Sequence, residues 1–138
     1  MKILIIDDEM TALSKMKLLL APYGDCTLSA HSHQALQLCA RAIQGGVPFE
    51  LITIDIQLGD TNGHDLMEAI KEMEAKAKVT AAKKIMITAS GTKENLMKAY
   101  TKGCDAFLVK PVKRDALEAK MLSMGYAKKG VATMTDVH

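Results

Sequence analysis

The chain has 138 residues, of which 49 % are hydrophobic and 25 % are charged. This length fits one compact domain, and the composition excludes a disordered or fibrous protein. No apolar stretch approaches the roughly 18 residues that a membrane-spanning helix needs. The short apolar run 3–6 ends at once in acidic residues, so we expect no signal peptide, no membrane association and a cytoplasmic location.

The net charge of +2 is unevenly distributed along the chain. Residues 1–70 hold 4 Lys/Arg and 9 Asp/Glu, whereas residues 71–138 hold 14 and 7. A basic surface can bind nucleic acid, but these lysines are spread over several predicted elements with few aromatic residues between them. We interpret them as solvated helix faces and expect no direct contact with nucleic acid. The three cysteines lack CxxC spacing and are predicted to be buried free thiols.

Five short apolar runs divide the chain at regular intervals, and they lie at 2–6, 26–30, 51–54, 84–87 and 106–109. Runs of this length, rich in Ile, Val and Leu, are typical of strands that are buried on both faces. The segments between them carry apolar residues at steps of three and four, which predicts helices. Pro22 and Gly24 end the first of these helices, and Gly45 and Gly46 end the second.

The predicted helices and strands alternate from the start of the chain to its end. In chain order, the apolar helix faces expected to join the core are Met10, Leu13, Met16 and Leu20; Ala35, Cys39 and Ala42; Leu66, Ile70 and Met73; Leu96 and Tyr100; and Leu117 and Met121. This alternation predicts an α/β fold with right-handed crossovers and a parallel sheet covered by helices on both faces. We expect one domain over residues 1–124 and a tail over 125–138.

Polar residues follow the strands at the edge where ligands bind in an open parallel sheet. Asp7 and Asp8 follow the first strand, Asp55 follows the third, Thr88 ends the fourth and Lys110 follows the fifth. Each residue alone has an ordinary structural explanation, such as an acidic group favoured at the start of a helix. Four strands that end in complementary groups at one edge indicate a functional site instead.

Where carboxylates cluster, either their pKa values rise or a cation compensates their charge. Two carboxylates about 4 Å apart repel by roughly 4 kcal/mol at an effective dielectric constant of about 20. Oxygen ligands with open positions suit Mg²⁺, and Mn²⁺ should be able to replace it. A carboxylate beside such an ion can act as a nucleophile and form an aspartyl phosphate, while a threonine and a lysine stabilise the transferring group.

The motifs Ile5-Ile6-Asp7-Asp8-Glu9, Asp55, Thr88-Ala89 and Lys110-Pro111 together resemble the response-regulator receiver family of two-component signalling, over about residues 1–124. The resemblance implies a flavodoxin-like, doubly wound, five-stranded parallel sheet of the (βα)5 type, the fold of the chemotaxis protein CheY.

The resemblance also assigns roles to residues. Asp8 would bind Mg²⁺ directly and Asp7 largely through water, while Asp55 would bind the metal and accept the phosphoryl group. The backbone carbonyl of Gln57 would supply another metal ligand. The resemblance implies that Thr88 and Lys110 contact phosphate oxygens. It places Phe107 at the switch-aromatic position, and it predicts a cis peptide between Lys110 and Pro111.

Some positions depart from the family pattern. Leu58-Gly59 stands where the family often has Met-Pro, which predicts a looser loop after the phosphoacceptor. Gln57 and Ser90 occupy positions that flank the attacking water in this family. We interpret the pair His31 and His33 as a solvated helix start.

The partners implied by the resemblance are a histidine kinase or a histidine phosphotransfer protein as donor, and an unknown downstream protein. Phosphorylation is expected to move Phe107 from a more exposed rotamer into space behind the fourth strand. That movement would reshape the face of the fourth helix, fifth strand and fifth helix. Candidate residues of this face are Lys93, Met97, Lys102, Lys113, Arg114 and Lys120. An acidic partner or a second copy of the chain is expected to bind there.

Three alternatives remain open from the sequence. A haloacid-dehalogenase-like phosphatase also forms an aspartyl phosphate, but its second Asp would stand where Gln57 is found. A receiver that only binds partners would lack one of the acidic pair, the threonine or the lysine. The chain could equally be a receiver excised from a longer response regulator or hybrid kinase. In every receiver reading, the protein catalyses only its own phosphorylation and dephosphorylation.

Overall fold

Five parallel strands form the central sheet in the computed structural model, which describes residues 1–128. The strands are β1 (Lys2–Ile6), β2 (Asp25–Ser29), β3 (Leu51–Asp55), β4 (Lys83–Thr88) and β5 (Ala106–Val109), and their order in the sheet is β2-β1-β3-β4-β5. This order confirms the predicted flavodoxin-like topology, in which the chain reverses direction across the sheet between β1 and β3.

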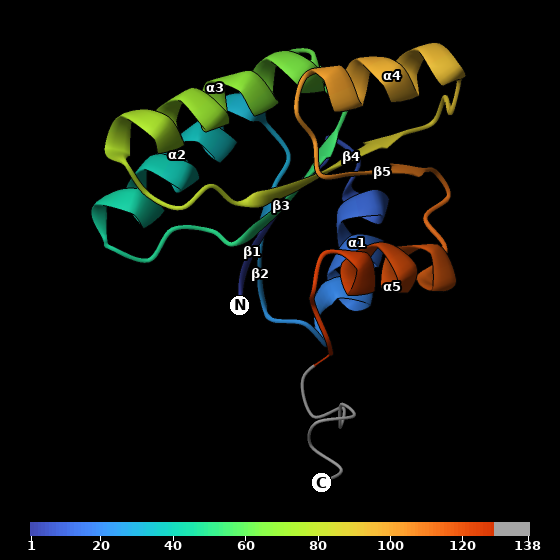
Figure 1. Ribbon diagram of the computed structural model, residues 1–138, viewed down its shortest axis with the longest axis horizontal. Helices are drawn as coiled ribbons and strands as arrows, with labels where there is room; N and C mark the ends of the chain where they lie inside the picture. Colours follow the sequence, from blue (N-terminus) through green and yellow to red (C-terminus); the bar gives the residue numbers. More distant parts are fainter. Residues whose placement is uncertain (129–138) are drawn as a thin grey trace, which may run out of the picture.

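Five helices cover the two faces of the sheet (Figure 1). Those helices are α1 (Met10–Leu20), α2 (Ser32–Gln44), α3 (Gly63–Ala77), α4 (Lys93–Thr101) and α5 (Arg114–Ser123). One face is covered by α1 and α5 and the other by α2, α3 and α4, and each face has its own apolar core. In the described part of the chain, none of the helices has the length and apolar character needed to cross a membrane.

β3 is buried throughout, and β1 and β4 are buried after their first residue, as their continuous apolar runs predicted. The edge strand β2 was expected to be buried as well but is mostly half-buried, and β5 exposes Val109 at its end. In β1, Ile3 and Ile5 face the α1–α5 side, whereas Leu4 and Ile6 face the side of α2 and α3. None of the four exposes more than 1 % of its surface. The five predicted strands are all present, with ends that differ by at most one residue.

Two of the predicted helix faces are wrong in part. Met10, expected in the core, is 68 % exposed, because it is the first residue of α1 and lies beyond the end of the sheet. Leu96 and Tyr100 in α4 are 37 % and 45 % exposed, and Ala99 is the buried residue of this helix. Because α4 packs over the edge strand β5, the sheet beneath it covers only a narrow line of side chains.

The residues after α5 turn back onto the domain. Gly125 adopts a positive φ of 91°, and the Tyr126 backbone N–H donates to the carbonyl of Met121 at 2.9 Å. The Tyr126 ring packs against the core shared by α1 and α5. The part of the predicted tail from residue 129 to 138 lies outside the described residues.

A buried ion pair at the opposite end of the sheet was not anticipated. Lys84 in β4 is 2 % exposed and Glu74 in α3 is 5 % exposed. The Lys84 Nζ donates to Glu74 Oε1 at 2.6 Å and to the Ala82 carbonyl at 2.8 Å, while Glu74 Oε2 accepts from the Ala82 N–H at 2.7 Å. This network fastens α3 to the start of β4.

Candidate functional site

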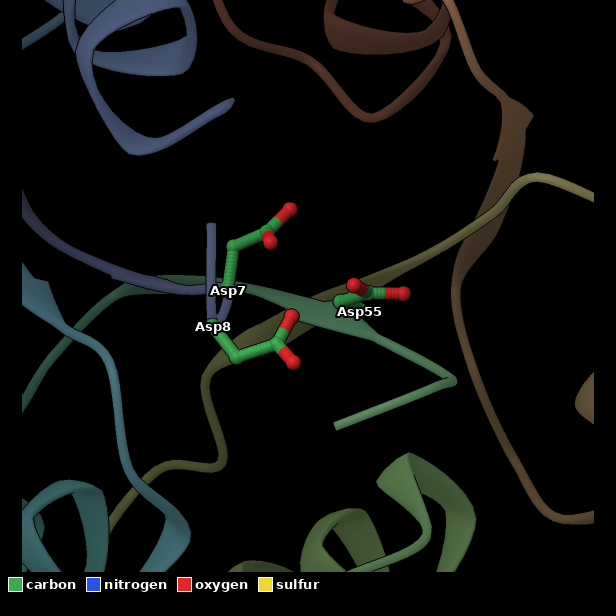
Figure 2. Close-up of side chains that lie close together, drawn as sticks. All are labelled: Asp7, Asp8 and Asp55. Carbon is green, nitrogen blue, oxygen red and sulfur yellow. The ribbon is translucent and has the colours of Figure 1, made fainter. Parts of the chain in front are cut away.

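Three carboxylates meet where β1 and β3 end. The two strands pair so that Ile6 lies opposite Ile54, which places the residues that follow them side by side. One oxygen each from Asp7, Asp8 and Asp55 lies within 4.8 Å of the others, and Figure 2 shows the three side chains at this edge. Asp7 and Asp55 are buried, at 3 % and 4 % exposure, whereas Asp8 is exposed.

The environment of Asp55 opposes its negative charge. Burial raises the pKa of this carboxyl above its ordinary value, and the neighbouring charge of Asp7 acts in the same direction. The Gln57 backbone N–H, which donates to Asp55 Oδ1 at 3.0 Å, and the Lys110 ammonium act against this increase but do not cancel it. A bound cation would therefore stabilise the charged form of this carboxyl group.

Lys110 is the cation that the protein itself supplies. Its Nζ lies 2.8 Å from Asp7 Oδ2, 3.2 Å from Asp55 Oδ2 and 3.7 Å from Glu9 Oε1. Burial alone would lower the pKa of Lys110, but the contacts with Asp7 and Asp55 outweigh it and raise that pKa. The close approach to Asp7 was missed by sequence reasoning. The Lys110–Pro111 peptide is cis, as the resemblance implied.

Thr88 ends β4 beside this cluster and is 1 % exposed. Its hydroxyl accepts a hydrogen bond from the Ser90 N–H at 3.1 Å. A pocket of about 400 Å³ lies next to it, and its lining includes Gln57, His64 and Lys98. His64 is only 2 % exposed, and its Nδ1 has no hydrogen-bond partner among the described residues.

Phe107 is buried rather than exposed. It lies opposite Met86 in the sheet, is 7 % exposed and belongs to the core beneath α2, α3 and α4. Side chains alternate along β5, so this position points toward the covered face. The exposed rotamer expected before phosphorylation is therefore not the one in this structure.

The loop between β3 and α3 is shaped by two glycines. A Cβ at Gly63 would overlap the backbone carbonyl of Asp55, so only glycine allows α3 to start this close to Asp55. A Cβ at Gly59 would lie 3.2 Å from Asp8 Oδ2. Asn62 caps α3 by accepting from the His64 N–H at 2.7 Å.

The donor set fits a hard divalent cation. Two buried carboxylates, one exposed carboxylate and nearby backbone carbonyls are the oxygen ligands that such ions take, and exposure on one side leaves room for water. The cysteines are free thiols, as predicted, but Cys26 is only partly buried. Cys39 and Cys104 lie in the core beneath α2, α3 and α4, and burial raises their pKa values to about 12 and about 11.

The fold and the site define a signalling domain of the phosphoacceptor type. Residues 3–122 match the family model described as the response regulator receiver domain. The chain therefore belongs to the response-regulator receiver family and takes the phosphoacceptor role in two-component signalling. Receiver domains bind a divalent metal at an acidic cluster, which here is Asp7, Asp8 and Asp55.

Individual relatives agree with this assignment. The chain is 30 % identical to hybrid signal transduction histidine kinase L of Dictyostelium discoideum over 129 residues, which are 94 % of this chain and 7 % of the kinase. It is 33 % identical over 112 residues to response regulator protein PilR of Pseudomonas aeruginosa, covering 80 % of this chain and 23 % of PilR. The chain thus spans less than a quarter of either protein.

A solved structure shows the same architecture. The CheY-like receiver domain protein of Methanospirillum hungatei JF-1 superimposes with a TM-score of 0.71 and 29 % identity, over 89 % of this chain and 91 % of that protein. The haloacid-dehalogenase-like alternative is not supported by these relationships.

Proposed function

We propose that Asp55 is the residue that accepts the phosphoryl group, with Mg²⁺ as the physiological cation and Mn²⁺ able to replace it. Asp7, Asp8, Asp55 and the backbone carbonyl of Gln57 would hold the ion. The observation that carries this proposal is the buried Asp55 carboxylate, which shares the Lys110 ammonium with Asp7 at 3.2 and 2.8 Å. The metal supplies charge neutralisation for the incoming phosphoryl group.

The transfer follows from the chemistry of these groups. A carboxylate oxygen of Asp55 attacks the phosphorus of a phosphohistidine, so that a P–O bond forms and the P–N bond breaks. The electron pair of the broken bond stays on the imidazole, which takes up a proton. Lys110 and the Thr88 hydroxyl would contact the phosphoryl oxygens and stabilise the charge that spreads over them.

The phosphoryl donor is proposed to be a histidine kinase or a histidine phosphotransfer protein. The chain would act on no separate substrate, and its catalysis would be limited to its own phosphorylation and dephosphorylation. Gln57 and Ser90 flank the position of the attacking water in the second reaction. We propose a cytoplasmic location.

The output is proposed to pass through α4, β5 and α5. This face carries exposed apolar side chains, since Met97, Tyr100 and Val109 are 59 %, 45 % and 44 % exposed. Lys93, Lys113 and Arg114 are exposed around it, which favours an acidic protein partner or a second copy of the chain over direct nucleic-acid binding. Lys102, another predicted member, is engaged by Glu68 at 2.8 Å.

Phosphate uptake tests the assignment of Asp55. The parent protein should gain one phosphoryl group from acetyl phosphate in the presence of Mg²⁺, and Asp55→Asn should not. Intact-protein and peptide mass spectrometry would locate the modification. Asp65→Asn, at an exposed acid in the first turn of α3, is the matched control and should be modified as the parent is. Modification of the Asp55→Asn variant to the parental extent, or no effect of chelation, would show the assignment to be wrong.

Coupling to the output face needs a separate measurement. Beryllofluoride, a stable mimic of the phosphoryl group, should shift the NMR signals of Thr88, Phe107 and residues 92–102 in the parent. The reason is that the Thr88 hydroxyl is expected to move toward the phosphoryl oxygens. Thr88→Ala should confine the shifts to residues around Asp55. Equal shifts over 92–102 in both proteins would contradict a role for the Thr88 hydroxyl.

A further inference from the structure

The loop after the phosphoacceptor is bound to a distant helix by one side chain. Asp60 Oδ2 accepts two hydrogen bonds from Ser32, from the backbone N–H at 3.1 Å and from the hydroxyl at 2.8 Å. These hydrogen bonds hold the pKa of Asp60 below its ordinary value. The two residues are 28 positions apart in sequence, so this contact joins the loop between β3 and α3 to the start of α2.

The start of α2 has no cap of its own. His31 occupies the N-cap position, and its side chain makes no capping hydrogen bond. The N–H groups in the first turn of a helix lack partners within the helix, and Asp60 supplies one of these partners. Because Asp60 is an acidic group at the positive end of α2, its charge also interacts favourably with the helix dipole.

The same region is linked to the metal-binding end of β1. The Asp7 backbone N–H donates to the Ser29 carbonyl at 3.1 Å. The hydroxyl of the buried Ser29 in turn donates to the His31 carbonyl at 2.9 Å. His31, the residue before α2, is therefore connected to Asp7 through Ser29, and the two hydrogen bonds that Ser32 donates to Asp60 connect the loop to the same region.

The loop needs such an anchor because of Gly59. Glycine restricts the backbone less than any other residue, and Gly59 separates the proposed carbonyl ligand at Gln57 from Asp60. A backbone bridge between Gln57 and Asn62 joins the two ends of the loop, and Asp60 lies in the part of the loop between them. Gly59 itself lies against the Asp8 carboxylate, so any displacement of the loop changes the space around two proposed metal ligands.

We propose that Asp60 is a positioning residue of the metal site: its hydrogen bonds to Ser32 fix the loop that presents the Gln57 carbonyl, and thereby increase the affinity for Mg²⁺. This inference rests on the proposed function, since it assumes a metal ion between Asp8, Asp55 and Gln57. The role does not depend on the charge of Asp60, because a single oxygen accepts both hydrogen bonds and an amide oxygen can do the same.

Magnesium titrations of the full chain, followed by backbone amide NMR signals of residues 7–9 and 55–59, test this role. Asp60→Ala should bind Mg²⁺ about three- to tenfold more weakly, somewhat less than the roughly 10–100-fold loss seen when a group bonded directly to a metal ligand is removed. Asp60→Asn retains the acceptor oxygen and should bind as the parent does. At saturating Mg²⁺, the rates of phosphorylation by acetyl phosphate should converge for all three proteins.

A second variant separates the positioning role from simple stabilisation of α2. Adding His31→Ser to Asp60→Ala gives α2 a side-chain cap of its own, and should restore the melting temperature without restoring Mg²⁺ affinity. Three results overturn the inference: parental affinity in Asp60→Ala, equal weakening in Asp60→Asn, or recovery of affinity on adding His31→Ser. Absence of Mg²⁺-dependent shifts in the parent would instead refute the proposed function, and the inference with it.

Discussion

Asp55→Asn should stabilise the protein in the absence of metal, although it removes the proposed phosphoacceptor. Burial disfavours the charge of Asp55, and the Asp7 carboxylate, with an oxygen within 4.8 Å of an Asp55 oxygen, adds a repulsion of at least about 3.5 kcal/mol at an effective dielectric constant of about 20. The Lys110 ammonium, 3.2 Å from Asp55, attracts the carboxylate by about 5 kcal/mol on the same scale. Because the pKa of Asp55 is raised, burial and repulsion together exceed this attraction, and we expect an excess of about 2 kcal/mol, a typical cost of burying a polar group in a protein.

This gain should depend on pH in a defined direction. Because burial and the charge of Asp7 raise the pKa of Asp55 above 3.8, the folded protein holds this proton more tightly than the unfolded chain does. The penalty is then fully present above the raised pKa and disappears as the pH falls toward 3.8. The difference between variant and parent should therefore be largest at neutral pH and vanish in acid.

Thermal unfolding in EDTA and in Mg²⁺ measures both effects. In EDTA at pH 7, a gain of about 2 kcal/mol should raise the melting temperature of Asp55→Asn by roughly 8 °C. At a free Mg²⁺ concentration a hundred times its dissociation constant, the parent should gain about 2.7 kcal/mol, and the variant should gain less.

Asp25→Asn provides the control, since Asp25 is exposed at the start of β2, at the opposite edge of the sheet. This change should alter stability by less than about 0.5 kcal/mol. If Asp55→Asn melts below the parent in EDTA while the control is unchanged, the electrostatic reasoning is wrong.

Two further measurements probe buried groups away from Asp55. Lys84→Ala should lower the free energy of unfolding, measured in urea, by about 3–5 kcal/mol, because it leaves Glu74 charged and buried without a partner. The double variant Lys84→Met, Glu74→Leu should change this free energy little. Equal losses in both proteins would contradict this reasoning. Burial and the charges of Lys98 and Lys102 lower the pKa of His64, so the unfolded chain takes up this proton more readily than the folded protein does. The parent should therefore lose stability relative to His64→Leu as the pH falls below about 6.5, by up to about 1.4 kcal/mol per pH unit. Parallel stability curves for these two proteins between pH 7.5 and 5 would mean that His64 is freely protonated in the folded state.

Much of the fold could be predicted from local sequence patterns. The strands could be predicted because a strand buried on both faces must be apolar at every position, as in Ile3–Ile6. The positions that group around Asp55 could be predicted for a related reason. In a parallel sheet, the residues that follow the strands meet at one edge whatever the side chains between them are.

Other features depend on contacts between residues far apart in sequence. The buried state of Lys84 is decided by Glu74 on α3, and nothing in the strand pattern around Lys84 distinguishes it from an exposed lysine. Leu96 and Tyr100 have helical spacing, but α4 lies over the edge of the sheet, where apolar side chains remain exposed. Phe107 is buried because its place in β5 faces the covered side.

The clearest division lies within the site itself. The sequence alone was enough to place Asp7, Asp8, Asp55 and Lys110 at one edge, because each lies at the carboxyl end of a strand or within two residues after it. Only the tertiary structure shows that Lys110 contacts Asp7 more closely than Asp55, and that Asp60 binds α2. Periodicity reports which face of an element is buried, whereas the partner of a polar side chain is decided by how separate elements pack together.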